Sequence, residues 1–148
     1  MFGGLDLAAK DTNKTGICLI DDNIEIYTVR EDDQIINLLK DAKVIAVDAP
    51  LTSKKVTFRS AEREIMKDFG PMLPINMSGM RLLAERALRL KKILEVELIE
   101  TFPRAVEKNL NIDMDGLAIE FNNGHEYDAY LCALAAESYY HERYLTDL

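Results

Sequence analysis

The sequence predicts an α/β domain that is built around a mixed β-sheet, and three observations support this fold class. Three β-rich segments separated by short polar turns occupy residues 2–29, which favours an antiparallel meander. A helix-like segment and a further strand follow at 32–49, and such a connection makes a right-handed crossover to a parallel strand. The apolar run 44–47 lacks polar alternation, which is typical of a strand buried on both faces.

The first half of the chain supplies most of the strands. They are expected at 2–9, 15–20, 24–29 and 44–49. Gly3 and Gly4 weaken the first strand, but a glycine in a strand often marks the close approach of another backbone or of a ligand. Asp32 or Asp33 is expected to cap a helix that ends near Asp41. The fourth strand then returns parallel to the first strand, which is its simplest partner.

The second half of the chain is mainly helical. We expect helices at 59–69, 78–94, 103–110 and 127–140, a strand at 96–101, and a short helix or loop at 111–122. Ser78 is expected to cap the longest of these helices, whose apolar residues recur at helical spacing. Asn123 is expected to cap the last helix, with Glu126 placed for a capping box. The sequence contains no glycine-rich phosphate loop, which weighs against simple nucleotide binding.

Length and composition predict one soluble domain. The 148 residues, of which 48% are hydrophobic, are enough to bury one sizeable core. No apolar run approaches the ~20 residues that span a bilayer, and the N-terminus does not resemble a signal peptide, so we expect no membrane partner. Cys18 and Cys132 lie in apolar runs without metal-ligand spacing, which indicates buried thiols in a reducing, cytoplasmic environment.

Charge is distributed unevenly along the chain. The net charge is −8, which by itself argues against a nucleic-acid partner. The segment 52–92, however, holds ten basic and four acidic residues, so it carries +6 and leaves −14 to the rest. Such asymmetry favours a polyanionic partner, although two solvated helices of mixed charge would give the same pattern. Arg59 and Arg63 are four residues apart on one helical face, and we expect them to contact substrate phosphate.

Four acids stand where an α/β sheet places its ligands. Asp6, Asp48 and Glu100 fall at strand ends, and Asp128 falls in the first turn of the last helix. Because ligands bind beyond the carboxyl ends of parallel strands, we expect Asp6 and Asp48 to meet there. Carboxylates hold Mg²⁺ together with water and substrate phosphate, and two such ions can activate water for phosphoryl transfer.

Each of these residues also has a structural interpretation. Asp48 could cap a turn, Glu100 could be an exposed strand residue, and Asp128 could complement the helix dipole. Asp6 is the hardest to explain in this way, because Leu5 and Leu7 flank it in a strand that looks buried. His125 is a candidate proton shuttle or a partner of a metal ligand, although a surface histidine near a helix start is the commoner case.

Several segments together resemble a known family. They are Gly3–Ala8, Thr15–Gly16, Val47–Leu51, Ile99–Pro103 and His125–Ala129, followed by an alanine-rich helix. In order and spacing they resemble a domain-of-unknown-function family of predicted nucleases with a ribonuclease H-like fold, and more distantly the Holliday-junction resolvases. The resemblance covers nearly the whole chain. It implies a mixed five-stranded sheet of order 3-2-1-4-5, with the second strand antiparallel to the rest and helices on both faces.

The resemblance also implies a function. It implies metal-dependent hydrolysis of nucleic-acid phosphodiester bonds, with Mg²⁺ or Mn²⁺ held by Asp6, Asp48 and Asp128 and with Glu100 as a fourth catalytic acid. Two alternatives stay open: a non-catalytic nucleic-acid-binding or regulatory module on the same fold, and a phosphotransferase-like relative, for which 148 residues is short. The sequence leaves the oligomeric state open, and a homodimer is one option.

Overall fold

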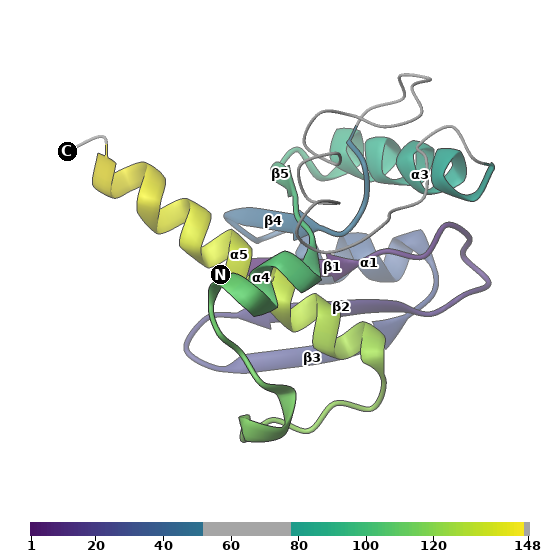
Figure 1. Ribbon diagram of the computed structural model, residues 1–148. Helices are drawn as coiled ribbons and strands as arrows, with labels where there is room; N and C mark the ends of the chain where they lie inside the picture. Colours follow the sequence, from purple (N-terminus) through teal and green to yellow (C-terminus); the bar gives the residue numbers. More distant parts are fainter. Residues whose placement is uncertain (52–77, 147–148) are drawn as a thin grey trace.

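The computed structural model describes residues 1–51 and 78–146, and within them five strands form one mixed sheet (Figure 1). The strands are β1 (Phe2–Asp6), β2 (Thr15–Ile20), β3 (Ile24–Val29), β4 (Val44–Val47) and β5 (Glu97–Glu100). Their order is β3-β2-β1-β4-β5. Strand β2 is antiparallel to both of its neighbours, whereas β1, β4 and β5 are parallel. This confirms the sheet that the ribonuclease H-like resemblance implies.

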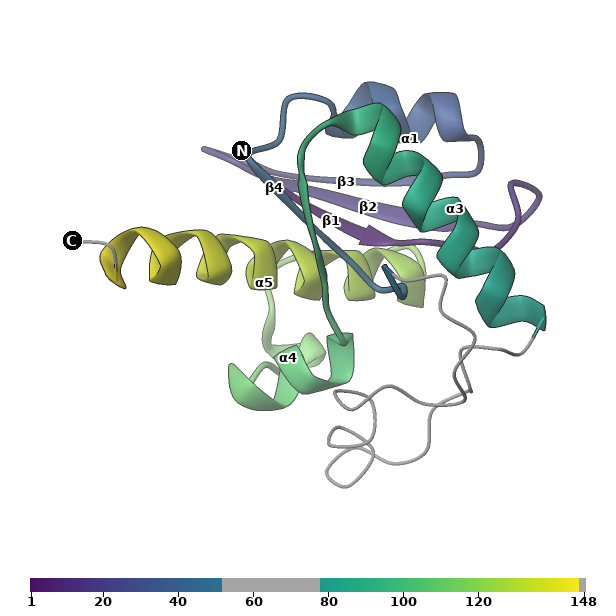
Figure 2. The same cartoon turned by 90° about the horizontal axis from the view of Figure 1, so that it is seen from above.

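Helices cover both faces of this sheet, as expected (Figure 2). They are α1 (Asp32–Leu39), α3 (Ser78–Leu94), α4 (Pro103–Asn109), the 3₁₀ turn η1 (Met114–Gly116) and α5 (Gly124–Thr146). Helices α1 and α3 lie on one face over the larger apolar core, and α5 crosses the other face over β1, β2 and β4. None of the helices in the described ranges is both long and apolar enough to span a membrane.

Two helix boundaries differ from the prediction. The N-cap of α1 is Glu31 rather than Asp32 or Asp33, and the Gln34 side chain accepts a hydrogen bond from the Glu31 backbone. Asp32 is not free to cap, because its carboxylate pairs with a buried arginine, Arg86, at 2.8 Å. Helix α5 begins at Gly124 and continues beyond residue 140, since no glycine or proline interrupts its last turns.

Some of the expected features lie outside the described residues. These are the basic helix expected at 59–69, which contains Arg59 and Arg63, and the linker that follows it. Helix α3 begins at Ser78 as expected, and Ala84, Ala87 and Leu90 face the core.

Among the basic residues of α3, Arg86 is buried and adds no charge to the surface. It was counted with the surface charges that favour a polyanion, but its side chain is only 1% exposed. Its guanidinium donates hydrogen bonds to the carbonyl oxygens of Ala8 at 2.8 Å and Arg30 at 2.7 Å, and it pairs with Asp32. It therefore links the segment after β1 to the end of β3 and the start of α1.

Two strand glycines allow α5 to lie directly on the sheet. A Cβ atom at Gly4 would overlap the backbone of Ala129 and Ala133, and one at Gly16 would overlap the backbone of His125. The close backbone approach that glycine in the first strand predicted is therefore confirmed. These contacts fix the height of α5 above β1 and β2, and with it the position of the residues at its beginning.

Replacing Gly4 by alanine should destabilise the protein by about 1–3 kcal/mol, because the added methyl group meets rigid helix backbone and not a flexible side chain. Thermal or denaturant unfolding measures the effect. Gly116→Ala is the matched control, since among the described residues no atom beyond its chain neighbours lies within 4 Å of the Cβ that it would add. Equal stability of the two variants would show that α5 does not rest on Gly4.

Candidate active site

The carboxyl ends of β1 and β4 bring two acids side by side. The parallel register pairs Leu5 with Val47, and the Asp48 amide donates a hydrogen bond to the Leu5 carbonyl at 2.9 Å. Asp6 and Asp48 are the next residues on each strand, so strand alternation places their side chains on the same face of the sheet. The prediction that strands one and four are parallel neighbours is confirmed.

The face that carries these acids is the one under α5. Gly4 and Ala46 precede Asp6 and Asp48 by two residues, and both strand positions lie against α5. Asp128 stands on α5 next to Ala129, whose carbonyl lies over Gly4. It lies in the second turn of the helix and not in the first, because α5 begins at Gly124, earlier than the sequence suggested.

The three aspartates influence one another electrostatically. Burial, followed by the charges of Asp6 and Asp128, raises the pKa of Asp48 to about 7. Burial likewise raises the pKa of Asp128 to about 6, where Arg104 opposes the shift and Asp6 adds to it. The pKa of Asp6 is raised mainly by burial, against a lowering effect of His125. Like charges close to one another at a poorly solvated sheet edge resist ionisation together.

Glu100 is not brought together with these three residues. The register between β4 and β5 pairs Glu100 with Val47, one position before Asp48. Alternation therefore directs its side chain to the opposite face of the sheet, on which α1 and α3 lie. Thr101, whose amide donates to the Val47 carbonyl at 3.0 Å, occupies the position next to Asp48.

A histidine is the hydrogen-bond partner of Asp6. Nδ1 of His125 lies 3.0 Å from Oδ2 of Asp6. A carboxylate can only accept, so Nδ1 is the protonated nitrogen in this contact and Nε2 is left as the acceptor of a neutral ring. Half of the His125 side chain is exposed, against 14% of Asp6. The pair thus places a potential proton acceptor at the solvent side of the acids.

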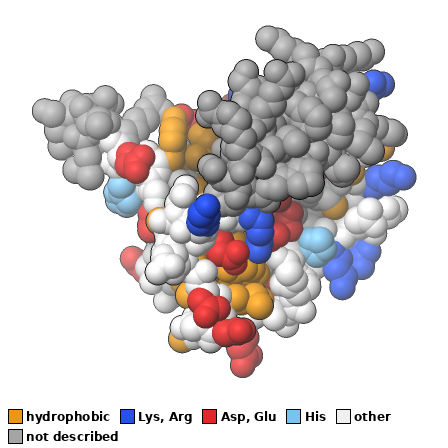
Figure 3. Space-filling model, viewed as in Figure 1, with side chains coloured by type: hydrophobic (Ala, Val, Ile, Leu, Met, Phe, Trp, Pro, Cys, Tyr) orange, Lys and Arg blue, Asp and Glu red, His pale blue; other side chains and the backbone are white. Residues whose placement is uncertain are grey.

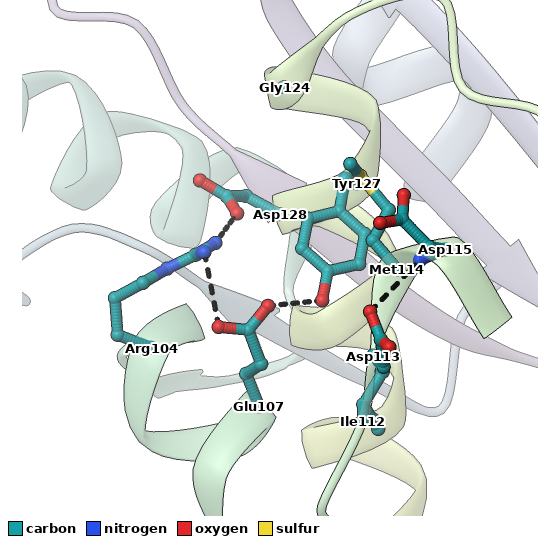
Figure 4. A pocket seen from close by; sticks show the side chains of 9 residues that line it. All are labelled: Arg104, Glu107, Ile112, Asp113, Met114, Asp115, Gly124, Tyr127 and Asp128. Atoms are coloured by element: carbon teal, nitrogen blue, oxygen red, sulfur yellow. Dashed lines mark hydrogen bonds and ion pairs between the residues drawn. The ribbon is translucent and has the colours of Figure 1, made fainter. Parts of the chain in front are cut away.

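An arginine that the sequence analysis did not single out neutralises Asp128. Figure 4 shows Arg104 of α4 paired with Asp128 and, at 3.4 Å, with Glu107. Its guanidinium also lies 5.6 Å from the centre of the Tyr127 ring, and the Tyr127 hydroxyl donates to Glu107. Its position in the sequence could have identified it as a site residue, because Arg104 lies in the first turn of a helix that follows a strand end, close to the expected acids.

The donor chemistry of the three aspartates suits a hard divalent cation, but their side chains do not already form a ligand set for one. Within residues 1–51 and 78–146, no three acidic, histidine or cysteine side chains are arranged so that they already form a metal cluster. The Asp128 carboxylate pairs with Arg104, and the Asp6 carboxylate contacts the ring of His125. A metal ion at this edge would therefore compete with Arg104 for the Asp128 carboxylate.

Two pockets border the acids. One of about 570 Å³ lies on the Arg104 side, between α4, η1 and the beginning of α5, and carries Glu107, Asp113, Asp115 and Asp128 (Figure 4). The other, of about 520 Å³, lies on the side of Asp6 and His125. Acidic and basic side chains lie beside one another near the middle of this face, and acidic side chains gather toward its lower end (Figure 3).

The sheet order and the helix that crosses it give the chain a ribonuclease H-like α/β fold. Two solved structures of RuvC from Thermus thermophilus are similar to it, one of them in complex with a Holliday junction substrate. The complex has a TM-score of 0.57 and 12% identity over 95% of this chain and 94% of that one. RuvC alone has a TM-score of 0.55 and 13% identity over 95% of each chain. The expected likeness to Holliday-junction resolvases is thus confirmed for the fold.

Comparison by sequence adds nothing to this assignment. A scan against protein-family models finds no match, and a search of curated proteins finds no similar sequence. At 12–13% identity, the structural likeness concerns the fold and not the chemistry.

The burial of Asp48, together with its repulsion from Asp6 and Asp128, predicts a pH-dependent effect of Asp48→Asn in EDTA. The pKa of Asp48 rises from 3.8 to about 7 on folding, so ionising it costs stability as the pH climbs through that interval. The variant should be more stable than the wild type by at least about 1 kcal/mol at pH 8. The difference should be lost below about pH 3, where the carboxyl is protonated in both states.

Urea unfolding at several pH values measures this difference. A constant difference across the pH range would show that Asp48 is not part of a repulsive cluster.

Proposed function

We propose that this chain is a divalent-metal-dependent nuclease that hydrolyses phosphodiester bonds of nucleic acid. Asp6, Asp48 and Asp128 would hold Mg²⁺ or Mn²⁺. The observation that carries the proposal is the meeting of Asp6 and Asp48 at the ends of two parallel strands, beneath an α5 that supplies Asp128. Three carboxylates that repel one another at a sheet edge create the demand for a compensating cation.

The residues around these acids suit hydrolysis. A bound ion would supply activation of water and stabilisation of the leaving oxygen. His125 can take up a proton at Nε2 while Asp6 holds its Nδ1, which fixes the tautomer and the orientation of the ring. Arg104, once released by Asp128, is a long and half-exposed cation that can pair with a phosphate oxygen.

Nucleic acid is the substrate that the fold comparison supports. One of the similar structures is RuvC bound to a Holliday junction, which is a branched DNA. The contact of Arg59 and Arg63 with substrate phosphate stays a prediction, since both residues lie outside the described ranges. The three aspartates and His125 carry the proposal; Glu100, which belongs to the other face, does not.

A non-catalytic nucleic-acid-binding module is the second candidate, and one observation favours it. Arg104 already neutralises Asp128, so the fold has an internal cation where a metal ion would bind. A module of this kind would keep that ion pair in the presence of Mg²⁺ or Mn²⁺. Metal binding therefore separates the two functions.

Mn²⁺ should stabilise the wild type increasingly, with the logarithm of its concentration, by about 2.7 kcal/mol at a hundredfold excess over the dissociation constant. Asp48→Asn should lose most of this gain and all cleavage of a panel of branched, single-stranded and hybrid nucleic acids. Glu100→Gln is the matched control, because it removes one carboxylate charge from the opposite face and should keep the metal response.

Melting curves with Mn²⁺ and with EDTA measure these shifts. If Asp48→Asn responds to metal as fully as the wild type does, Asp48 is a structural residue and the proposed site is wrong. If the wild type itself neither responds to metal nor cleaves, the non-catalytic module is favoured.

His125→Ala should slow cleavage by about a hundredfold or more, because it removes the proton acceptor beside Asp6. It should leave the stabilisation by Mn²⁺ largely unchanged, and added imidazole should restore part of the rate. His141→Ala is the control, since His141 lies far along α5 against Phe2 and Tyr140. An unchanged cleavage rate would remove His125 from the mechanism.

A further inference from the structure

We propose that the pocket beside Asp6 binds a phosphate of the nucleic-acid backbone next to the bond that is cut, with Lys14 and Arg30 as its cationic contacts. This inference rests on the proposed function and adds the place where the substrate backbone enters the site. The pocket, called here the β1–β2 pocket, is lined by Asp6, Ala8, Asn13, Lys14, Arg30 and His125 among others. Its volume of about 520 Å³ leaves room for a phosphate and part of a sugar.

The charge of this pocket differs from that of the whole chain. Lys14 and Arg30 bring two positive charges, whereas Asp6 brings the single negative one and already has His125 as its partner. Among the described residues, no carboxylate pairs with Lys14 or Arg30. In a protein with net charge −8, two cations without such a partner beside the acid row suit an anionic ligand.

The walls of the β1–β2 pocket are fixed before any ligand binds. Buried Arg86 donates to the carbonyl oxygens of Ala8 and Arg30, which belong to the two opposing walls. The Ala8 amide donates to the Thr15 hydroxyl at 3.0 Å. The Arg30 guanidinium donates to the Thr12 carbonyl at 2.6 Å, which ties β3 to the β1–β2 turn. A site held in this way binds with little cost in conformational entropy.

The position of the pocket explains why its ligand would belong to the substrate. Asp6, which is one of the three aspartates of the candidate site, and its partner His125 both line the pocket. A phosphate between Lys14 and Arg30 therefore lies beside the proposed site of cleavage, on the opposite side from Arg104. The pocket on the Arg104 side has Glu107, Asp113, Asp115 and Asp128 around a single arginine, so by itself it attracts a phosphate less than the β1–β2 pocket does.

Binding of labelled nucleic acids over a range of salt concentrations tests the proposal. The assay uses fluorescence anisotropy with a four-way DNA junction, a single strand and an RNA–DNA hybrid, in EDTA and in Ca²⁺. The double variant Lys14→Ala/Arg30→Ala should weaken binding at least about tenfold and lower the slope of log K against log salt by at least about 1. The control Lys10→Ala/Lys40→Ala removes the same charge from residues outside the pocket. It should change the affinity and the salt slope much less than the double variant of the pocket does.

The outcomes separate this inference from the proposed function. Equal salt slopes for the double variant and its control would overturn the phosphate site while leaving the nuclease proposal intact. Absence of nucleic-acid binding by the wild type would overturn both.

Lys14→Glu is a second variant, because it reverses a charge of the pocket and leaves the contact between Arg30 and Thr12 intact. It should weaken nucleic-acid binding more than Lys14→Ala does. The proposal is also overturned if replacing Lys14 and Arg30 weakens the binding of a nucleoside triphosphate but not the binding of nucleic acid.

Discussion

Repulsion among three partly buried aspartates is the constraint on which the candidate site depends. Asp6, Asp48 and Asp128 converge because two parallel strands end together under one helix. Burial and their mutual charge raise the pKa of Asp48 to about 7. A fold that keeps such a group must compensate it, and here Arg104 and His125 do so at the two ends of the row. This cost in stability is what a bound divalent cation would remove.

The rest of the structure serves to hold these groups in place. Gly4 and Gly16 let α5 approach the sheet, so that His125 and Asp128 reach the strand ends. Buried Arg86 joins the turn after β1 to the end of β3 and thereby shapes the β1–β2 pocket next to the acids. An arginine without exposure is stable there only because its guanidinium finds partners in Asp32 and two backbone carbonyls.

Much of this arrangement could be predicted from the sequence, and the limits have physical reasons. The apolar run before Asp48 and the strand–helix–strand crossover that precedes it are local patterns, and together they predict that the fourth strand pairs with the first and brings Asp6 next to Asp48. Glu100 was grouped with them because the sequence does not show the β4–β5 register, and one residue of shift changes the face. The partnership of Arg104 with Asp128 depends on how α4 packs against α5. Arg86, by contrast, lies on the apolar face of its helix, so helical spacing could have identified it as buried.

The position of Mn²⁺ in a crystal, located by its anomalous scattering, tests the central claim most directly. The account predicts density for the ion among the carboxylates of Asp6, Asp48 and Asp128, with the Arg104 guanidinium moved off Asp128. It is contradicted if crystals grown in Mn²⁺ show no ion at this edge of the sheet and Arg104 still pairs with Asp128. In that case the arginine is the permanent counter-ion of the site, and the acids are not there to bind metal.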